Sequence, residues 1–410
     1  MNKALFVQIL SLFALSARSD AGFVSVPGRQ SVVPGISVLL SDSLDLIRGK
    51  RVGLITNHTA RDERGRSSID LIHDAPDVTL SALFAPEHGI RGSARGGARI
   101  ATSVDGKTGV QIYSLYGYTK VPTARMLDGI DVLVYDIQDV GARMYTYVWT
   151  MTLAAEAAKK AGKKFIVLDR PNPIRADIVE GGSIEKRYRS FTGLHDVPLR
   201  YGLTPGELAR YLVATGQIDA DITVVPLQNY QRMMWWSDTG LDWIPPSPNI
   251  GDLEAALLYP GMSFFEATNL SEGRGTDEPF RLVGARWLRD AAAITRAMNA
   301  RQLDGVRFET VKRRIGKGEK FGGEVIPMVH VVVTYPSRVR SSEIAAHLLR
   351  EIYLRHRKEF RWQAGFGIEE LSGSRALRTA VENGGVSDLL NRWRAQSAEF
   401  EAESEPYRLY

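Results

Sequence analysis

Residues 84–92 read Phe84-Ala85-Pro86-Glu87-His88-Gly89-Ile90-Arg91-Gly92, and they follow directly on the apolar run 78–84. A short apolar run of this kind is typical of a buried β-strand. A carboxylate, an imidazole and a guanidinium follow it closely, and glycines among them let the backbone approach a ligand. Ligands of open α/β sheets bind beyond the carboxyl ends of the strands. The pattern therefore predicts a strand that leads into a functional site. The alternative is a surface turn in which Glu87 and Arg91 merely pair.

Apolar runs of this kind alternate with helical patterns through the first part of the chain. The clearest helical pattern covers residues 147–160, which are rich in alanine, end in two lysines and are closed by Gly162. Strands separated by helices pair in parallel and form a doubly wound sheet, so the sequence predicts an α/β fold. The predicted strands are residues 51–56, 78–84, 110–115, 132–137, 165–168 and 222–226.

Three of the other predicted strands also end in polar side chains. Because the carboxyl ends of parallel strands lie at one edge of the sheet, we expect these side chains to gather near Glu87. This shared edge favours the functional interpretation of the loop at Glu87. The side chains are Asn57, Asp139, Asp169 and Asn172.

The chain of 410 residues is longer than one hydrophobic core normally serves, so two domains are expected. Residues 22–249 form the predicted N-terminal domain, and residues 250–410 form a smaller α+β domain. The elements predicted in this second domain are helices at 287–298 and 341–356, strands at 306–311 and 328–334, and a helical stretch at 374–395 that is broken at Gly384-Gly385.

Residues 1–21 have the pattern of a cleavable export signal. Lys3 gives a positive start, residues 4–17 are almost all apolar, and Ser19 and Ala21 are small residues of the kind that a signal peptidase reads. The apolar run is short for a membrane span, and the alternative is a retained N-terminal anchor. The sequence thus predicts an exported protein, in the periplasm or outside the cell, without stable membrane insertion.

Composition excludes several classes of function. The chain contains no cysteine, which removes disulfides, thiolate metal sites and cysteine nucleophiles. Its net charge of +5 is small for this length and its charges are mixed, so a nucleic-acid partner is not indicated. There is no dinucleotide fingerprint, phosphate loop or zinc-ligand motif, and we predict no cofactor and no metal site.

The acidic residues suggest glycosidic cleavage. Paired carboxylates are the usual equipment for this reaction, in which one protonates the leaving oxygen and the other assists the anomeric centre. The two acids must differ in environment so that one stays protonated. His88 would tune Glu87 or bind a substrate hydroxyl. The candidates that follow predicted strands are Glu87, Asp136, Asp139 and Asp169, and those in the later run 261–280 are Glu266 and Glu272.

Two arginines are candidates for binding an anionic group of the substrate. Arg143 and Tyr145 stand just beyond Asp139, and Arg274 stands between two glycines. A guanidinium matches a carboxylate through two parallel hydrogen bonds. The alternative for each arginine is a structural ion pair.

Four motifs stand in a fixed order along the chain. They are Ala85-Pro86-Glu87-His88-Gly89-Ile90-Arg91-Gly92, Tyr135-Asp136-Ile137-Gln138-Asp139-Val140-Gly141-Ala142-Arg143 with Tyr145-Thr146-Tyr147, Leu168-Asp169-Arg170-Pro171-Asn172-Pro173, and Asn269-Leu270-Ser271-Glu272-Gly273-Arg274-Gly275-Thr276. Together they resemble the exo-β-N-acetylmuramidase family of peptidoglycan hydrolases. The resemblance implies a Rossmann-like N-terminal domain without a nucleotide, a smaller C-terminal domain, and an active site in the cleft between them. It also implies removal of terminal N-acetylmuramic acid from the non-reducing ends of peptidoglycan fragments.

The resemblance places the family's principal catalytic glutamate at Glu87. Our candidates for a second catalytic group are Asp139 and Glu272, chosen because they stand near Arg143 and Arg274. The 2-acetamido group of the sugar is an alternative internal nucleophile, which a second acid would only orient. The lactyl carboxylate of muramic acid is an anionic group that Arg143 and Arg274 would bind. The predicted substrate-binding residues are His88, Arg91, Asn57, Arg143, Tyr145, Asp169, Asn172, Asn269 and Arg274.

The predicted function is therefore that of an exported exo-β-N-acetylmuramidase, a glycoside hydrolase of cell-wall turnover whose partners are muramic acid saccharides. The alternative from another class is a non-catalytic peptidoglycan- or sugar-binding protein that kept the cleft. The number of acids in the motifs argues against it, because binding alone does not need them. An esterase or amidase would need a serine nucleophile or a metal, and the sequence shows no motif for either.

Overall fold

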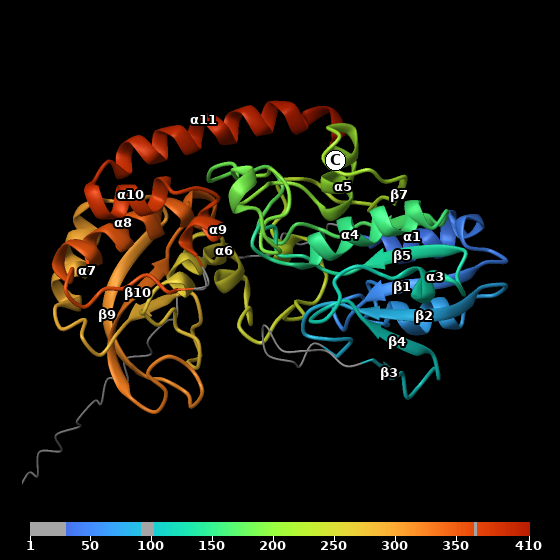
Figure 1. Ribbon diagram of the computed structural model, residues 1–410, viewed down its shortest axis with the longest axis horizontal. Helices are drawn as coiled ribbons and strands as arrows, with labels where there is room; N and C mark the ends of the chain where they lie inside the picture. The colour runs from blue at the N-terminus through green and yellow to red at the C-terminus, as the bar shows by residue number, and fades with distance from the viewer. Residues whose placement is uncertain (1–29, 92–101, 365–366) are drawn as a thin grey trace, which may run out of the picture.

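The computed structural model describes residues 30–91, 102–364 and 367–410, and it has two lobes that lie side by side (Figure 1). The N-terminal lobe is built on a seven-stranded sheet and the C-terminal lobe on a three-stranded sheet. The predicted α/β fold with a smaller second unit is confirmed. The predicted export signal, residues 1–21, lies outside the described residues.

The strands of the N-terminal lobe are β1 (Arg51–Thr56), β2 (Thr79–Ala85), β3 (Ser103–Val104), β4 (Gln111–Ser114), β5 (Val132–Asp136), β6 (Lys164–Leu168) and β7 (Ile222–Val225). Their order in the sheet is β3-β4-β2-β1-β5-β6-β7, and every neighbouring pair is parallel except β3 with β4. Without β3, this is the doubly wound order, whose switch point lies between β1 and β5. All six predicted strands are present, with bounds shifted by at most two residues.

Helices cover both faces of this sheet, because successive residues of a strand point to opposite faces. Val132 and Val134 of β5 pack in the same cluster as the apolar residues of α1 and α2, whereas Leu133 and Tyr135 pack with those of α4 and α5. The predicted helix 147–160 is α4, with Gly162 at φ +64° beyond its last lysine. The helices of this lobe are α1 (Gly35–Asp42), α2 (Ser68–His73), α3 (Ala124–Leu127), α4 (Tyr147–Lys160) and α5 (Pro205–Ala214).

The C-terminal lobe packs helices on an antiparallel sheet with the order β8-β10-β9. The predicted break at Gly384-Gly385 is confirmed, with both glycines at positive φ, +98° and +92°. None of the helices in the described part of the chain has the length and apolar character that a membrane crossing needs. The elements are α6 (Leu253–Met262), η4 (Ser263–Ala267), β8 (Leu282–Gly284), α7 (Ala291–Ala300), β9 (Val306–Arg314), β10 (Val325–Val333), α8 (Ser341–Arg355), α9 (Ile368–Ser372), α10 (Ala376–Asn383) and α11 (Val386–Ser404).

Helix α6 approaches the start of α8 very closely. A Cβ atom on Gly261 would lie 1.9 Å from the backbone oxygen of Ser341, so only glycine fits there. This packing fixes the last turn of α6, which carries Tyr259 and Pro260. Glycine and proline are poor residues for the interior of a helix, and the sequence therefore gave no clear signal for α6.

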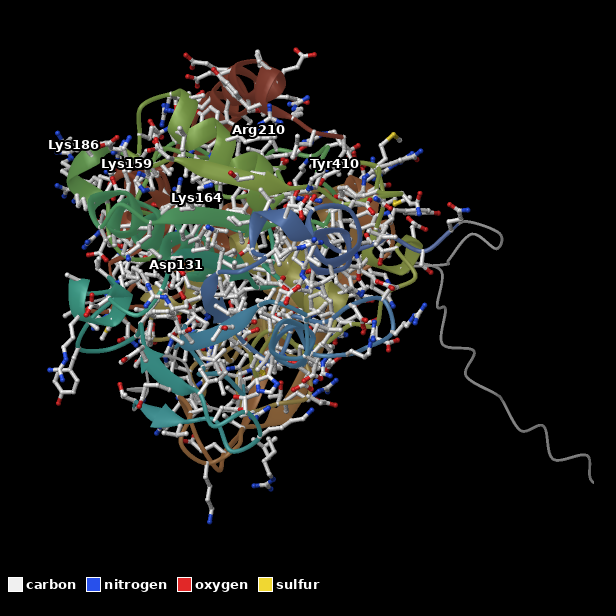
Figure 2. The ribbon with its side chains drawn as sticks, turned by 90° about the vertical axis from the view of Figure 1, so that its right-hand side faces the viewer. Asp131, Lys159, Lys164, Lys186, Arg210 and Tyr410 are labelled. Carbon is white, nitrogen blue, oxygen red and sulfur yellow. The ribbon has the colours of Figure 1, made fainter. Side chains whose placement is uncertain are left out.

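The end of the chain returns to the N-terminal lobe. Helix α11 runs along both lobes, and the C-terminus lies beside α5 (Figure 1). Tyr410, labelled in Figure 2, donates a hydrogen bond of 2.9 Å to Asp169 and accepts one of 2.6 Å from the N–H of Leu227. Tyr211 of α5 donates to Glu403 of α11 over 2.8 Å. The predicted domain boundary between residues 249 and 250 stays a prediction. Residues at the end of the chain, which follow this boundary, form hydrogen bonds with residues that precede it.

The two lobes also share buried apolar residues. One continuous cluster contains Trp149 of α4, Phe264 of η4 and Trp393 of α11. The rings of Phe264 and Trp393 lie 6.2 Å apart, and a second cluster fills only the opposite face of the seven-stranded sheet. The lobes are therefore packed on one another through a common core.

Candidate active site

A cavity of about 790 Å³ opens between the two lobes. This volume is within the usual range for small-molecule sites. The N-terminal lobe contributes the turn after β2 and the loop before α4, and the C-terminal lobe contributes the motif run 266–280 and the tip of the β9–β10 hairpin. The polar side chains that line the cavity are Glu87, His88, Tyr116, Tyr145, Thr146, Thr192, Ser247, Asn249, Tyr259, Glu266, Arg274, Thr276 and Glu319.

A tight turn at the end of β2 presents Glu87 to this cavity. The N–H of Gly89 donates to the carbonyl of Pro86 over 3.0 Å, which leaves Glu87 and His88 at the two central positions. His88 has φ +67° although it carries a side chain, and Gly89 follows at φ +74°. A non-glycine residue in this region is strained, and such strain is common where a site fixes its geometry. The His88 ring meets Tyr147 edge-on, with the ring centroids 6.5 Å apart.

Thr146 holds the carboxylate of Glu87. Its hydroxyl donates a hydrogen bond of 2.6 Å to Oε2 of Glu87. Thr146 is the residue before α4, and its side chain does not cap that helix. The turn after β2 and the start of α4 are thereby joined at the cavity wall.

Tyrosines form the floor between the two lobes. The ring of Tyr145 meets the rings of Tyr147 and Tyr259 edge-on, with centroids 4.8 Å and 5.9 Å apart. Burial raises the pKa of Tyr145 and Tyr259 well above the usual value of 10. Both residues line the cavity, and their hydroxyls therefore stay protonated. The Tyr145 hydroxyl itself is buried beneath the cavity surface.

A network of two acids and two cations supports the cavity wall on the side of the C-terminal lobe, and Glu266 and Arg274 are its members that line the cavity. Arg274 pairs with Glu266, and its Nε lies 3.1 Å from Oε1 of Glu272. The other oxygen of Glu272 lies 3.0 Å from Nζ of Lys320. Both oxygens of Glu272 are engaged and its side chain is buried, whereas Glu266 lines the cavity. Burial raises the pKa of Glu266, and the charge of Arg274 opposes this effect.

Comparison with known proteins identifies the family. Residues 52–254 match the model described as exo-beta-N-acetylmuramidase NamZ, N-terminal, and residues 257–410 match the model of the C-terminal part. The chain belongs to this family. It is 39% identical over 417 residues to the peptidoglycan beta-N-acetylmuramidase NamZ of Bacillus subtilis (strain 168), and the match covers 100% of both proteins. The resemblance inferred from the four motifs is confirmed.

Two solved structures share the fold. One is a DUF1343 family protein from Bacteroides fragilis NCTC 9343, with a TM-score of 0.86 and 36% identity over 93% of this chain and 100% of that one. Another DUF1343 family protein from the same organism has a TM-score of 0.72 and 27% identity over 93% of this chain and 99% of that one. Each of these two solved structures therefore contains both lobes of the fold described here.

The NamZ family fold buries Arg143 away from the cavity. Its side chain has no exposed surface and donates to the carbonyls of Gly182, Val197 and Leu371 over 2.7, 2.8 and 3.0 Å. Burial lowers its pKa to about 9. The predicted contact of Arg143 with a substrate anion finds no support in this position, because the guanidinium instead ties loops of the N-terminal lobe to α9.

Asp139 is also buried behind the cavity wall. One of its carboxylate oxygens accepts hydrogen bonds from the N–H of Gly141 over 2.7 Å and from the hydroxyl of Tyr201. Burial raises its pKa to about 7, although these donors oppose the shift. Asp139 therefore supports the loop that leads to Tyr145 and Thr146 rather than facing the cavity.

Asp169 directly follows β6 and lies within a cluster of donors. It accepts hydrogen bonds from the N–H of Gly206 over 2.8 Å, from Thr204 over 2.7 Å and from Tyr410 over 2.9 Å. Burial raises its pKa to about 7. A Cβ atom on Gly206 would lie 2.7 Å from the Asp169 carboxyl carbon, which explains the glycine in the first turn of α5. The structure places Asp169 at the junction with the C-terminus, away from the cavity lining.

The two predicted amides of the N-terminal lobe brace loops. Asn57 follows β1 and accepts from the N–H and the hydroxyl of Thr59 over 3.0 and 2.6 Å. Asn172 donates to the carbonyl of Leu203 over 3.0 Å and accepts from the N–H of Ile174 over 3.1 Å. Both are buried and neither lines the cavity.

The remaining predicted binding residues lie at the rim or beyond it. Asn269 is bonded to the carbonyl of Glu359 and the N–H of Arg361, each over 2.9 Å. Arg91 forms an ion pair of 2.8 Å with Asp105. The alternative interpretation of the loop as a surface turn had paired Arg91 with Glu87 instead. Of the predicted set, the structure brings Glu87, His88, Tyr145 and Arg274 together on the cavity.

Sequence reasoning missed several residues of the cavity wall. Thr146 lies inside the Tyr145-Thr146-Tyr147 motif, so its position was a usable signal. Glu266 stood among the candidate acids of the later run, but the second catalytic group was sought at Asp139 and Glu272 instead. Tyr259 sits in an apolar helix, where an aromatic residue cannot be told from core.

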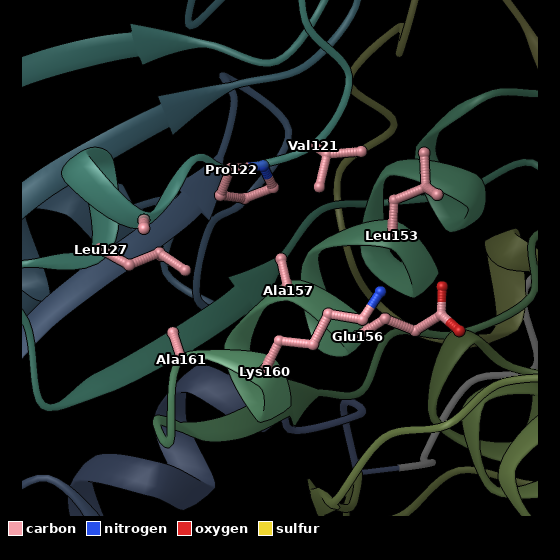
Figure 3. Close-up of a pocket in the computed structure, with 9 residues that line it drawn as sticks. Val121, Pro122, Leu127, Leu153, Glu156, Ala157, Lys160 and Ala161 are labelled. Carbon is pink, nitrogen blue, oxygen red and sulfur yellow. The ribbon is translucent and has the colours of Figure 1, made fainter.

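A second cavity, of about 330 Å³, lies on the N-terminal lobe beside α3 and α4 (Figure 3). Its walls are mostly apolar, with Val121, Leu127 and Leu153 among them, and Glu156 and Lys160 at its edge. It contains no pair of acids. In residues 30–91, 102–364 and 367–410 there is also no group of three or more histidines and acids that would hold a metal ion. The cavity between the lobes is therefore the candidate active site.

Proposed function

We propose that this protein is an exo-acting β-N-acetylmuramidase, a glycoside hydrolase that removes terminal N-acetylmuramic acid from the non-reducing ends of peptidoglycan fragments. The observation that carries the proposal is the position of Glu87, which stands on a strained turn at the cavity and is held by Thr146. The full-length relationship to a peptidoglycan beta-N-acetylmuramidase supplies the substrate class. Muramic acid saccharides are the proposed partners.

In this proposal Glu87 is the general acid that protonates the leaving glycosidic oxygen. Water or the substrate's own 2-acetamido oxygen then reaches the anomeric carbon from the other side, and both routes need the acid. Glu266 is the better candidate for the second carboxylate, because it lines the cavity, whereas Glu272 is fully engaged and Asp139 is buried. Glu266 therefore either activates the water or orients the acetamido group.

Two groups on the cavity suit the polar parts of the sugar. Arg274 has five N–H donors, and its ion pairs with Glu266 and Glu272 leave others for the lactyl carboxylate. The protonated hydroxyl of Tyr259 suits a carbonyl or hydroxyl oxygen of the substrate. Export through residues 1–21 would bring the enzyme to the periplasm or the medium, where its substrate is found.

A chromogenic β-N-acetylmuramide tests the proposal, with the matching N-acetylglucosaminide as control. Release from the muramide alone is expected, because only this sugar carries the lactyl group. Glu87→Gln should keep the fold and lower kcat by about 10²-fold or more, the usual weight of a general acid. A folded wild-type protein that releases neither chromophore, yet retains peptidoglycan fragments in a pull-down, would instead be a binding protein.

A further inference from the structure

One lysine fastens the tip of the β9–β10 hairpin to the loop that carries Glu266. The ammonium of Lys320 lies within hydrogen-bond distance of four backbone carbonyls and one carboxylate oxygen. The carbonyls are those of Phe265 and Glu266 at 3.3 Å, Thr268 at 3.0 Å and Leu270 at 2.9 Å, and the carboxylate oxygen is Oε2 of Glu272 at 3.0 Å.

This arrangement depends on a compact cation. Carbonyl oxygens that point at one another repel, and a positive charge in their centre holds them together. A lysine ammonium has three rotatable N–H donors and fits such a centre, whereas the flat fork of an arginine does not. The backbone of residues 265–270 is thus folded around Lys320.

The hairpin tip is also part of the cavity. The N–H of Gly316 donates to the carbonyl of Gly275 over 2.8 Å, next to Arg274. Gly318 and Glu319, directly before Lys320, line the cavity opposite Glu87 and Tyr145. One side chain therefore connects two segments of the C-terminal lobe that both form its wall.

We propose that Lys320 is a positioning residue, which holds the carboxylate of Glu266 at the cavity wall through the backbone of residues 265–270 and through Glu272. The structural part of this proposal stands on the contacts alone. Its kinetic part rests on the proposed function, in which Glu266 serves as the second carboxylate.

The charge of Lys320 reaches Glu266 as well. The groups that face this carboxyl are Arg274, Glu272, Tyr259 and Lys320. Burial and Glu272 raise the pKa of Glu266, whereas Arg274 and Lys320 lower it. Removal of the lysine charge should therefore make Glu266 harder to ionise, which is an effect that loop packing alone would not produce.

Lys320→Met tests the proposal, and Lys317→Met is a matched control because Lys317 is exposed in the same hairpin. Hydrogen exchange of residues 263–276 should rise about tenfold or more in the first variant and stay unchanged in the second. The kcat for the muramide should fall about tenfold or more, since small displacements of a catalytic group cost this much, while KM changes little. The limb of the pH–rate profile that belongs to Glu266 should move to higher pH by about 1 unit.

The two proposals fail in different ways. Wild-type protein without activity would overturn the proposed function, and the exchange experiment would still decide the role of Lys320. Exchange and kcat in Lys320→Met equal to those of Lys317→Met would overturn the positioning role. If Lys320→Met does not fold, Lys320→Arg decides. Lys320→Arg should keep the wild-type pH profile, but its kcat and its protection from hydrogen exchange should fall. Wild-type kcat and wild-type protection in this variant would refute the need for a compact ammonium.

Discussion

The hydroxyl of Tyr410 donates a hydrogen bond of 2.9 Å to Asp169, so the last residue of the chain is bonded to the carboxyl end of β6. The same hydroxyl accepts the N–H of Leu227, just beyond β7. The C-terminal helix is thereby anchored on the edge of the sheet that also leads into the candidate active site. The hydrogen bond therefore joins the N-terminal lobe to the C-terminal end of the chain.

Tyr410→Phe should destabilise the protein without changing its chemistry. It removes the donor to Asp169 and leaves the N–H of Leu227 without its acceptor, which costs about 1–3 kcal/mol of unfolding free energy. Urea unfolding measures this loss. Tyr407→Phe is the control, because the Tyr407 hydroxyl has no hydrogen bond within the described part of the chain. Equal stability of the two variants would contradict the anchoring role.

The contribution of Asp169 to stability should fall as the pH rises from about 4 to about 7. Burial raises the pKa of Asp169 from 3.8 to about 7, so in this window the folded state holds a proton that the unfolded state has lost. The contribution is fully present below pH 4 and is lost as the pH passes 7, with a size on the order of a few kcal/mol. Asp139 acts in the same direction.

Asp169→Asn isolates this effect, because an amide does not titrate. The stability of this variant relative to wild type should improve steadily between about pH 4 and about pH 7 in urea unfolding and then level off. A difference between the two proteins that stays constant over this range would show that Asp169 is ionised in the fold.

Thr146→Val should impair catalysis while leaving α4 intact. The hydroxyl of Thr146 donates to Glu87 and does not cap the helix, so its loss removes this one bond to the carboxylate and leaves the helix start unchanged. We expect kcat to fall about tenfold, because the acid loses a donor that fixes its position. Thr152→Val, in the same helix, removes only a bond to the carbonyl of Trp149 and should keep wild-type kcat.

Glu266→Gln and Glu272→Gln should separate chemistry from stability. Glu266 lines the cavity, and its amide should lower kcat about 10²-fold with little change in unfolding free energy. Glu272 lies between Arg274 and Lys320, so its amide removes the carboxylate that these two partly buried cations share and costs about 3 kcal/mol of stability. Calorimetry and kinetics on both variants check this division, and the reverse pattern would exchange the two roles.

The sheet and the position of Glu87 were predictable because their signals are local. Each strand is an apolar run that ends in polar residues, and the doubly wound order brings these ends to one edge. The turn at Pro86-Glu87-His88-Gly89 was visible from its glycine and its charged residues. The four motifs then added the family, which no single pattern establishes.

The partners of the other polar residues were not predictable, because they come from distant parts of the chain. Arg143 belongs to the second motif in the sequence, yet it donates to carbonyls at residues 182, 197 and 371. Asp169 meets a tyrosine 241 positions later. An acid or arginine near a strand end is a good candidate for a site, but burial decides whether it faces the ligand or holds the loop.

The shared core has a consequence for how the molecule comes apart. Trp149, Phe264 and Trp393 belong to one apolar cluster although they stand on different lobes. Neither half of the sequence can bury its share of that cluster alone, so the two halves should melt in one cooperative transition and behave poorly as separate fragments. The cleft between them is then a feature of a single folding unit, whose walls keep their spacing until the whole protein unfolds.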